Sequence, residues 1–139
     1  MELRNSHSIN KAVETALDIA VSMAHEYIMP EHLLMGLIQQ EPFKLALQKS
    51  RVDYNKLHAR LTKYLKDQDK KFGKYQVPVP SAQFTDLVQN ACTIAKRFKK
   101  EFAGVREYIV ALANLQDSMA AYMLDTAIED HESEFLEYL

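Results

Sequence analysis

The chain has 139 residues, of which 47% are hydrophobic and 26% are charged, so its length fits one ordinary globular domain or two very small ones. Its formal net charge of −2 weighs against non-specific nucleic-acid binding, which needs an excess of Lys and Arg to displace counterions. The single Cys92 cannot form an internal disulfide, which favours a reducing compartment, and we expect a cytoplasmic location. No apolar run approaches the roughly 18 residues of a membrane span, and no secretory signal is visible.

The first half of the chain has the periodicity of amphipathic helices. Apolar residues over 9–27 recur at the i, i+3, i+4, i+7 spacing of one helical stripe. Pro30 suits the first position of a second helix, where its missing N–H costs nothing, and Pro42 suits the opening of a third. Asp53 is a suitable N-cap for a fourth helix. The pattern therefore predicts four helices.

Residues 66–80 interrupt this pattern with charges, a glycine and prolines. Their Val-Pro-Val-Pro ending favours extended backbone, because a residue that precedes proline avoids the helical region, and we interpret the segment as a linker. After the linker, the first half repeats when the numbering is shifted by 75 residues. The match needs no gap from Ser6 to about Lys49, and it pairs Ser6 with Ser81 as candidate N-caps.

The sequence thus predicts an all-α fold, a tandem repeat of two four-helix units related by a pseudo-twofold axis and packed as one domain. We place this domain over 1–139, with repeat one at about 6–65, the linker at 66–80 and repeat two at about 81–139.

The same shift predicts particular core residues in the second repeat. Cys92, Phe98 and Phe102 fall on the apolar stripe of its first helix, and Tyr122 takes the place of a core leucine of the first repeat. Met119 is expected in the core as well. A buried cysteine is a small, inert hydrophobe, so Cys92 is not a candidate nucleophile.

No familiar catalytic motif occurs in the sequence. A phosphate-binding glycine loop, a Cys-x-x-Cys pair and a His-Glu-x-x-His helix are all absent from the 139 residues. No such motif therefore points to catalysis, and one alternative is a metal-dependent enzyme or metal-binding switch that uses His25, Glu26 and His32.

The one dense polar constellation is the segment His25-Glu26-Tyr27-Ile28-Met29-Pro30-Glu31-His32, between the first two predicted helices. It has three interpretations. It is a solvated loop whose Glu31 suits a helix N-terminus. Alternatively, it is a partner-binding patch in which Glu26 and Glu31 lie beside the exposed apolar groups Tyr27, Ile28 and Met29. Finally, His25, Glu26 and His32 are residue types that bind zinc.

The second repeat does not keep this constellation. It has Lys100 for His25, Arg106 for Glu31 and Glu107 for His32. The constellation thus belongs to one repeat only, which a solvated loop does not require.

The stretch HEYIMPEHLLMGLIQQ resembles the H-E-F-x-x-x-E-H-L-L-x-x-L-L segment of Clp N-terminal domains, the amino-terminal modules of Hsp100/Clp AAA+ unfoldases. The resemblance covers nearly the whole chain, including S-x-x-F at 81–84 and A-A-Y-M-L at 120–124. The family fold is itself a tandem of four-helix units. The second repeat, which reads GVREYI over 104–109, lacks the G-T-E-H signature of ClpC-type domains and is similar to the diverged repeat of ClpA.

The resemblance implies a docking domain of a ClpA-type unfoldase that works with the ClpP peptidase. Such a domain is not itself an enzyme and carries no cofactor of its own. Its partners would be the ClpS adaptor and protein substrates for regulated degradation, without nucleic acid or membrane. The family's adaptor contacts map onto Glu26, Glu31 and Ser81, and Tyr27 and Met29 would add apolar contact.

The resemblance also bears on cofactors. His25 matches a metal-binding position of the family, at which adventitious zinc is possible, while ATP and Mg²⁺ are expected only in separate ATPase modules. Met29-Pro30 replaces a Thr-Val pair, which removes an N-cap hydroxyl, and we expect Pro30 to compensate. The alternatives are a free-standing Clp-N-like binding module and the N-domain of a ClpC- or ClpB-type chaperone.

Overall fold

The computed structural model describes residues 4–68, 77–129 and 131–137. Within these ranges the chain forms eight helices: α1 (His7–Ser22), α2 (Pro30–Leu37), α3 (Glu41–Lys49), α4 (Tyr54–Lys66), α5 (Ala82–Arg97), α6 (Val105–Ala113), α7 (Met119–Ile128) and α8 (Glu132–Glu137). It also forms four two-residue strands: β1 (Arg4–Asn5), β2 (Tyr27–Ile28), β3 (Val79–Pro80) and β4 (Phe102–Ala103). The predicted helical tandem repeat is confirmed. The middle of the predicted linker, 69–76, lies outside the described residues.

Helix starts follow the predicted capping residues. The side chains of Ser6, Asp53 and Ser81 each accept a hydrogen bond from the backbone N–H three residues on, at 3.3, 3.1 and 3.1 Å. Pro30 is the first residue of α2, as predicted. These bonds satisfy N–H groups that have no partner inside a helix.

The first helices of the two repeats end in the same way. α1 and α5 both have 16 residues, and each ends in a turn whose non-glycine residue has positive φ, 57° at Ala24 and 55° at Lys99. The following N–H groups close the turn onto the helix, from His25 to the Ala20 carbonyl at 3.0 Å and from Lys100 to the Ala95 carbonyl at 2.9 Å. This left-handed closure offsets the strain of a side chain at positive φ.

The gap-free match between the repeats holds only to the end of α6. Three residues separate α2 from α3, whereas five separate α6 from α7. The two extra residues shift the face of α7 that packs on the core by two positions along the sequence. Met123 and Leu124 are therefore buried, while Tyr122 is 59% exposed. The prediction that Tyr122 replaces a core leucine is therefore wrong.

Other predicted core residues are also exposed. α5 ends at Arg97, so Phe98 and Phe102 leave the helical stripe and are 67% and 47% exposed. Met119 is 40% exposed because it is the first residue of α7. Cys92 is half-buried against the core rather than fully enclosed.

The four short strands tie the repeats together. β1 pairs in parallel with β4, and β2 pairs in parallel with β3, so the segment that precedes each repeat joins a loop of the other repeat. The Ser6 N–H donates to the Ala103 carbonyl at 2.9 Å, and the Ser81 N–H donates to the Ile28 carbonyl at 3.0 Å. The extended backbone predicted for the Val-Pro-Val-Pro segment is confirmed at β3.

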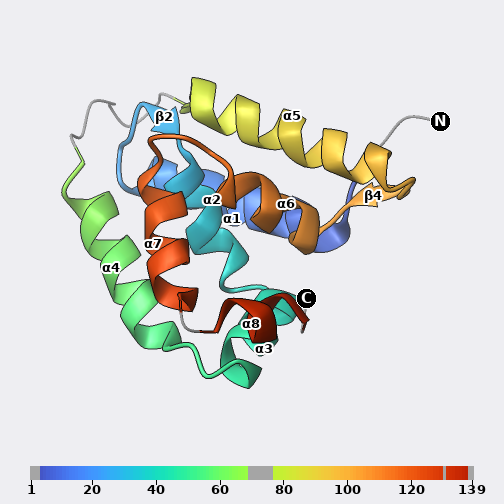
Figure 1. Ribbon diagram of the computed structural model, residues 1–139. Helices are drawn as coiled ribbons and strands as arrows, with labels where there is room; N and C mark the ends of the chain where they lie inside the picture. The colour runs from blue at the N-terminus through green and yellow to red at the C-terminus, as the bar shows by residue number, and fades with distance from the viewer. Residues whose placement is uncertain (1–3, 69–76, 130, 138–139) are drawn as a thin grey trace.

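The helices pack around α2, whose eight residues are all buried. α1 packs on α2, and α5 packs on α6. Figure 1 shows α4 and α7 side by side, with α3 and α8 together at one end of the molecule. Among the described residues, no helix has the length and apolar character needed to cross a bilayer.

Gly36 is predicted to be required for the α1–α2 contact. A Cβ atom at this position would overlap the backbone carbonyl of Ala12 in α1, which cannot rotate away. Alanine gains about 1 kcal/mol of helix propensity, but overpacking of this kind costs about 1–3 kcal/mol, so we expect Gly36→Ala to lower the urea midpoint. Gly104→Ala is the control, because its Cβ would have its nearest contact at 3.4 Å. An unchanged midpoint for Gly36→Ala would contradict the packing argument.

Candidate functional site

The predicted binding residues gather around the β2–β3 pair. The Val79 N–H donates to the Glu26 carbonyl at 3.1 Å, and the Ser81 N–H donates to the Ile28 carbonyl. Ser81 therefore lies beside the loop of the first repeat, although it begins the second. The Ile28 side chain is only 8% exposed and packs in the core, so the prediction that it is an exposed apolar group is wrong. We call the surface formed by Glu26, Tyr27, Met29, Val79 and Ser81 the β2–β3 surface.

The β2–β3 surface combines apolar and polar groups. Tyr27 is 46% exposed and Val79 is 50% exposed, and the two residues are paired in register across the strands. Glu26, Met29 and Ser81 are each partly exposed. The Ser81 hydroxyl caps α5, which leaves its proton able to donate to another group. Sequence reasoning missed Val79 because the Val-Pro-Val-Pro segment was interpreted only as a linker.

Glu31, at the start of α2, is only 3% exposed and is not part of this surface. Its Oε2 accepts hydrogen bonds from the Ala120 N–H at 3.1 Å and from the Ser118 hydroxyl at 3.3 Å, both at the start of α7. Burial raises the pKa of the Glu31 carboxyl, and the bond from Ala120 acts against that rise. The structure thus places this carboxylate at a helix N-terminus of the other repeat, where it joins the repeats.

His25 and His32 form a buried pair behind the same loop. The Met29 N–H donates to His32 Nδ1 at 2.9 Å, and His32 Nε2 lies 2.8 Å from His25 Nδ1. Because Nδ1 of His32 is an acceptor, its proton is on Nε2, which donates to His25. His32 therefore holds the Met29 N–H at the start of α2, which is a different group from the helical N–H that an N-cap hydroxyl would accept from.

The second repeat builds the same cap with charged groups. Glu107 Oε1 accepts from the Gly104 N–H at 2.9 Å, and its Oε2 pairs with Lys100 Nζ at 2.9 Å. These residues occupy the positions of His32 and His25 after a shift of 75. A neutral pair and an ion pair thus hold equivalent turns in equivalent geometry.

The histidine pair does not fit a metal site in this arrangement. Both ring nitrogens of His32 and Nδ1 of His25 are engaged in hydrogen bonds. Over the ranges 4–68, 77–129 and 131–137, no group of three or more His, Cys, Asp or Glu side chains is placed to hold an ion. The metal role predicted for His25 stays a prediction, with the observed geometry favouring a helix cap.

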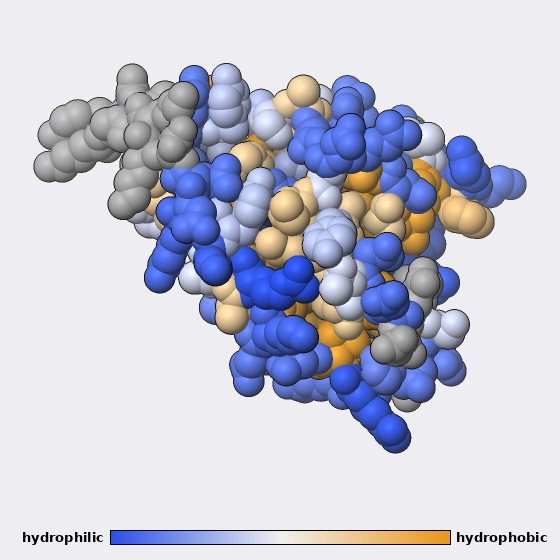
Figure 2. All heavy atoms as spheres, turned by 60° about the vertical axis from the view of Figure 1, so that its left-hand side comes forward, coloured by the Kyte–Doolittle hydropathy of each residue, from blue (hydrophilic) through white to orange (hydrophobic). Residues whose placement is uncertain are grey.

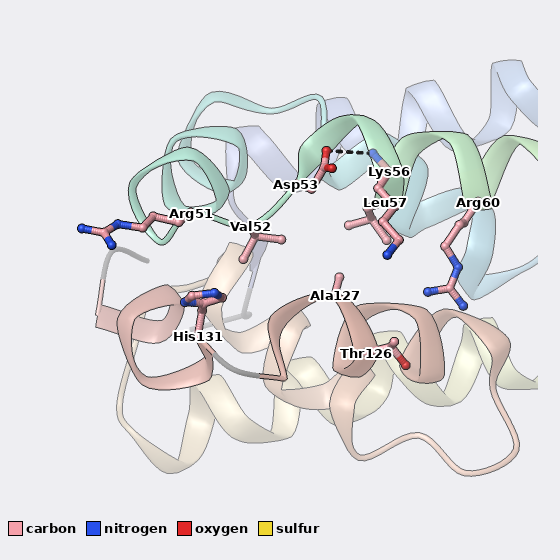
Figure 3. A pocket seen from close by; sticks show the side chains of 9 residues that line it. All are labelled: Arg51, Val52, Asp53, Lys56, Leu57, Arg60, Thr126, Ala127 and His131. Atoms are coloured by element: carbon pink, nitrogen blue, oxygen red, sulfur yellow. Dashed lines mark hydrogen bonds between the residues drawn. The ribbon is translucent and has the colours of Figure 1, made fainter.

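A separate cavity of about 210 Å³ lies between α4 and the α7–α8 junction and shares no residue with the β2–β3 surface. Figure 3 shows its lining, with Asp53 bonded to the Lys56 backbone and the Arg51 side chain directed away from the other residues drawn. Figure 2 shows that the side of the molecule carrying α4 and α7 is mainly hydrophilic, with apolar residues in smaller groups. The cavity is lined by Arg51, Val52, Asp53, Lys56, Leu57, Arg60, Thr126, Ala127 and His131.

Comparison with known proteins places this fold. A family model described as the Clp repeat (R) N-terminal domain matches residues 4–127. Among solved structures, the Hsp104 N-terminal domain from Candida albicans is similar, with 17% identity, 98% of this chain and 91% of that chain covered, and a TM-score of 0.82. No curated protein matches the chain.

Two further structures agree. The N-terminal domain of the ClpV1 ATPase from the Sci1 T6SS of E. coli EAEC has 20% identity, coverage of 96% and 82%, and a TM-score of 0.80. The N-terminal domain of ClpD from Arabidopsis thaliana has 15% identity, coverage of 96% and 93%, and a TM-score of 0.70. At these identities the likeness establishes the fold.

Acid should destabilise the protein through His32. Burial foremost, and the neighbouring His25 next, lower the pKa of His32 from 6.5 to about 4. Between these two pH values the unfolded chain binds more protons than the folded chain does. Protonation therefore leaves the free energy of unfolding unaffected above pH 6.5 and lowers it by about 3 kcal/mol as the pH falls to 4. Glu31 affects stability with the opposite sign because its pKa is raised in the folded chain. Its contribution to the free energy of unfolding is lost as the pH rises through the pKa of the folded state.

The double variant His25→Lys/His32→Glu, which copies the pair of the second repeat, isolates this effect. Urea unfolding between pH 6.5 and pH 4 should show a shallower loss of stability in this variant than in the parent. His7→Gln, at an exposed position of α1, should follow the parent curve. Parallel curves for the parent and the double variant would show that His32 does not govern the acid response.

Glu31→Ala is predicted to destabilise the fold rather than to alter the surface. It removes the acceptor of the Ala120 N–H and the Ser118 hydroxyl, which lie buried, at a cost of about 1–3 kcal/mol. Arg106→Ala, at the equivalent but exposed position, should change stability by less than about 0.5 kcal/mol. Thermal unfolding of both variants measures the difference, and equal melting temperatures would refute it.

Proposed function

We propose a docking function for this chain, which belongs to the Clp repeat N-terminal domain family. The chain is a non-catalytic domain, and we infer that it binds protein ligands, either adaptors or substrate segments, for an Hsp100/Clp AAA+ protein. The observation that carries the proposal is the β2–β3 surface. There, a loop held by backbone bonds exposes Tyr27 and Val79 beside the carboxylate of Glu26.

The chemistry of the β2–β3 surface suits a protein ligand. The Glu26 carboxylate accepts from a Lys, Arg or backbone N–H group, and such a charge-assisted bond contributes about 1.5–3 kcal/mol where it is partly desolvated. Tyr27 and Val79 supply an apolar contact of the kind enriched in interfaces. Because the loop is fixed before binding, little ordering entropy opposes association.

The identity of the ligand is a finer part of the proposal. The similar structures are N-domains of Hsp104, ClpV and ClpD, which supports the broad function of the family better than a ClpA-specific one. The ClpS adaptor remains one candidate ligand, supported by the presence of Glu26 and Ser81 on a single surface. Peptide segments of substrates, as for ClpC- or ClpB-type chaperones, are the other.

Calorimetric titration tests the surface. The chain is titrated with a ClpS-type adaptor and, separately, with an unfolded model protein. For the ligand that binds, Glu26→Ala should weaken binding about tenfold, or about 1.4 kcal/mol. Tyr27→Ala should have an effect of similar size, because it removes the exposed ring beside that carboxylate.

The matched control is Glu101→Ala, which removes the equivalent carboxylate of the second repeat and should leave this affinity unchanged. If neither Glu26→Ala nor Tyr27→Ala lowers the affinity, the ligand binds outside the β2–β3 surface. Absence of binding to either ligand at high concentration would overturn the docking function there.

A further inference from the structure

Positive charge is concentrated where α5 ends and β4 begins. Residues 96–106 contain five Lys or Arg side chains and one carboxylate, for a formal charge of +4. The whole chain carries −2, so the remaining residues sum to −6. We call this segment the α5–β4 tip; it forms one end of the molecule in Figure 1. Charge separated in this way produces a local field that the net charge conceals.

The α5–β4 tip also exposes two aromatic rings. Phe98 and Phe102 are 67% and 47% exposed. Lys96, Lys99 and Arg106 are exposed as well. Exposed phenylalanines surrounded by cations offer apolar contact and charge attraction to the same ligand.

The backbone of the tip is fixed. Lys99 adopts positive φ in the turn that closes α5, and Lys100 Nζ pairs with Glu107 at 2.9 Å. β4 is held by β1, and the Ser6 N–H donates to the Ala103 carbonyl. A surface that is ordered before binding loses less entropy when a ligand associates.

The equivalent loop of the first repeat has a different character. Tyr27 stands where the tip has Phe102, but the position of Arg106 is occupied by Glu31, whose carboxylate is buried against α7. The two loops thus share one backbone path and one exposed ring. They differ in charge, so they select different ligands.

We propose that the α5–β4 tip is a second docking surface, which binds an acidic protein segment carrying apolar side chains. Carboxylates of the segment pair with Lys96, Lys99 and Arg106, while its apolar side chains cover Phe98 and Phe102. The inference extends the proposed docking function to a second surface, and it holds whichever ligand the β2–β3 surface takes.

Two features favour a protein segment over nucleic acid or a bilayer. Glu101 is exposed and directly precedes Phe102 in the sequence, so an anionic lipid surface that approached this loop would also meet a carboxylate. A long polyanion such as DNA would also be repelled by the other residues of the domain, which carry a net negative charge. A short segment is not, because charges further away than about 8–10 Å are screened. The Glu101 carboxylate can instead accept from a backbone N–H of the segment.

Fluorescence anisotropy on the full chain tests this proposal. The probe is a labelled synthetic peptide in which Asp and Glu alternate with Leu and Phe. We expect saturable binding that weakens steeply as salt is added, and that weakens about tenfold or more in Lys99→Asn/Arg106→Gln and in Phe98→Ala/Phe102→Ala. Asn is chosen at 99 because it tolerates positive φ.

The matched control is Lys11→Gln/Lys63→Gln, which removes two exposed charges from α1 and α4 and should bind the peptide as the parent does. An equal loss in this control would overturn the proposal, because binding would then reflect net charge alone. Equal binding of a peptide with Asn and Gln for Asp and Glu would also overturn it. So would binding to phosphatidylserine vesicles or duplex DNA without binding to the peptide.

The outcome is separable from that of the β2–β3 surface. Glu26→Ala should leave the acidic peptide bound with unchanged affinity, and Lys99→Asn/Arg106→Gln should leave adaptor or substrate binding at the β2–β3 surface unchanged. If Glu26→Ala lowers the affinity for the acidic peptide as strongly as the tip variants do, the second surface is refuted. The docking function of the first surface would stand.

Discussion

The reciprocal pairing of strands between the repeats is the constraint on which the rest of this structure depends. Each repeat is preceded by an extended segment that completes a loop of the other repeat, through the N–H groups of Ser6 and Ser81. Both loops that follow a first helix are held by these bonds. Separating the repeats would break these bonds, at a net cost of about 0.5–1.5 kcal/mol for each.

Within this frame, one turn is built by two kinds of chemistry. His25 and His32 hold the first loop as a neutral pair, whereas Lys100 and Glu107 hold the second as an ion pair. Since the turn needs only an acceptor at the third helical position and a partner behind it, the charge of each loop is free to diverge. The β2–β3 surface and the α5–β4 tip are the results of that freedom.

Sequence periodicity predicted the helices and their caps because both depend on local spacing. It did not show where the first helix of each repeat stops, because a left-handed turn at Ala24 or Lys99 leaves no mark on the apolar stripe. Phe98 was misplaced for this reason. The burial of Glu31 was beyond local reasoning as well, since it depends on Ser118, 87 residues away, and on the longer connection before α7.

The strand exchange also has a kinetic meaning. Asn5 is registered against Ala103, so this pairing closes a loop of about 98 residues, whereas the α1–α2 and α5–α6 contacts join helices that are adjacent in sequence. Closing so large a loop costs conformational entropy, and this cost precedes the stabilisation that the strand hydrogen bonds provide. The strand pairs that hold both loops therefore form at a larger entropic cost than contacts between successive helices. A nascent chain that ends before residue 79 has the residues of the first loop but lacks the Val79 and Ser81 N–H groups that hold it.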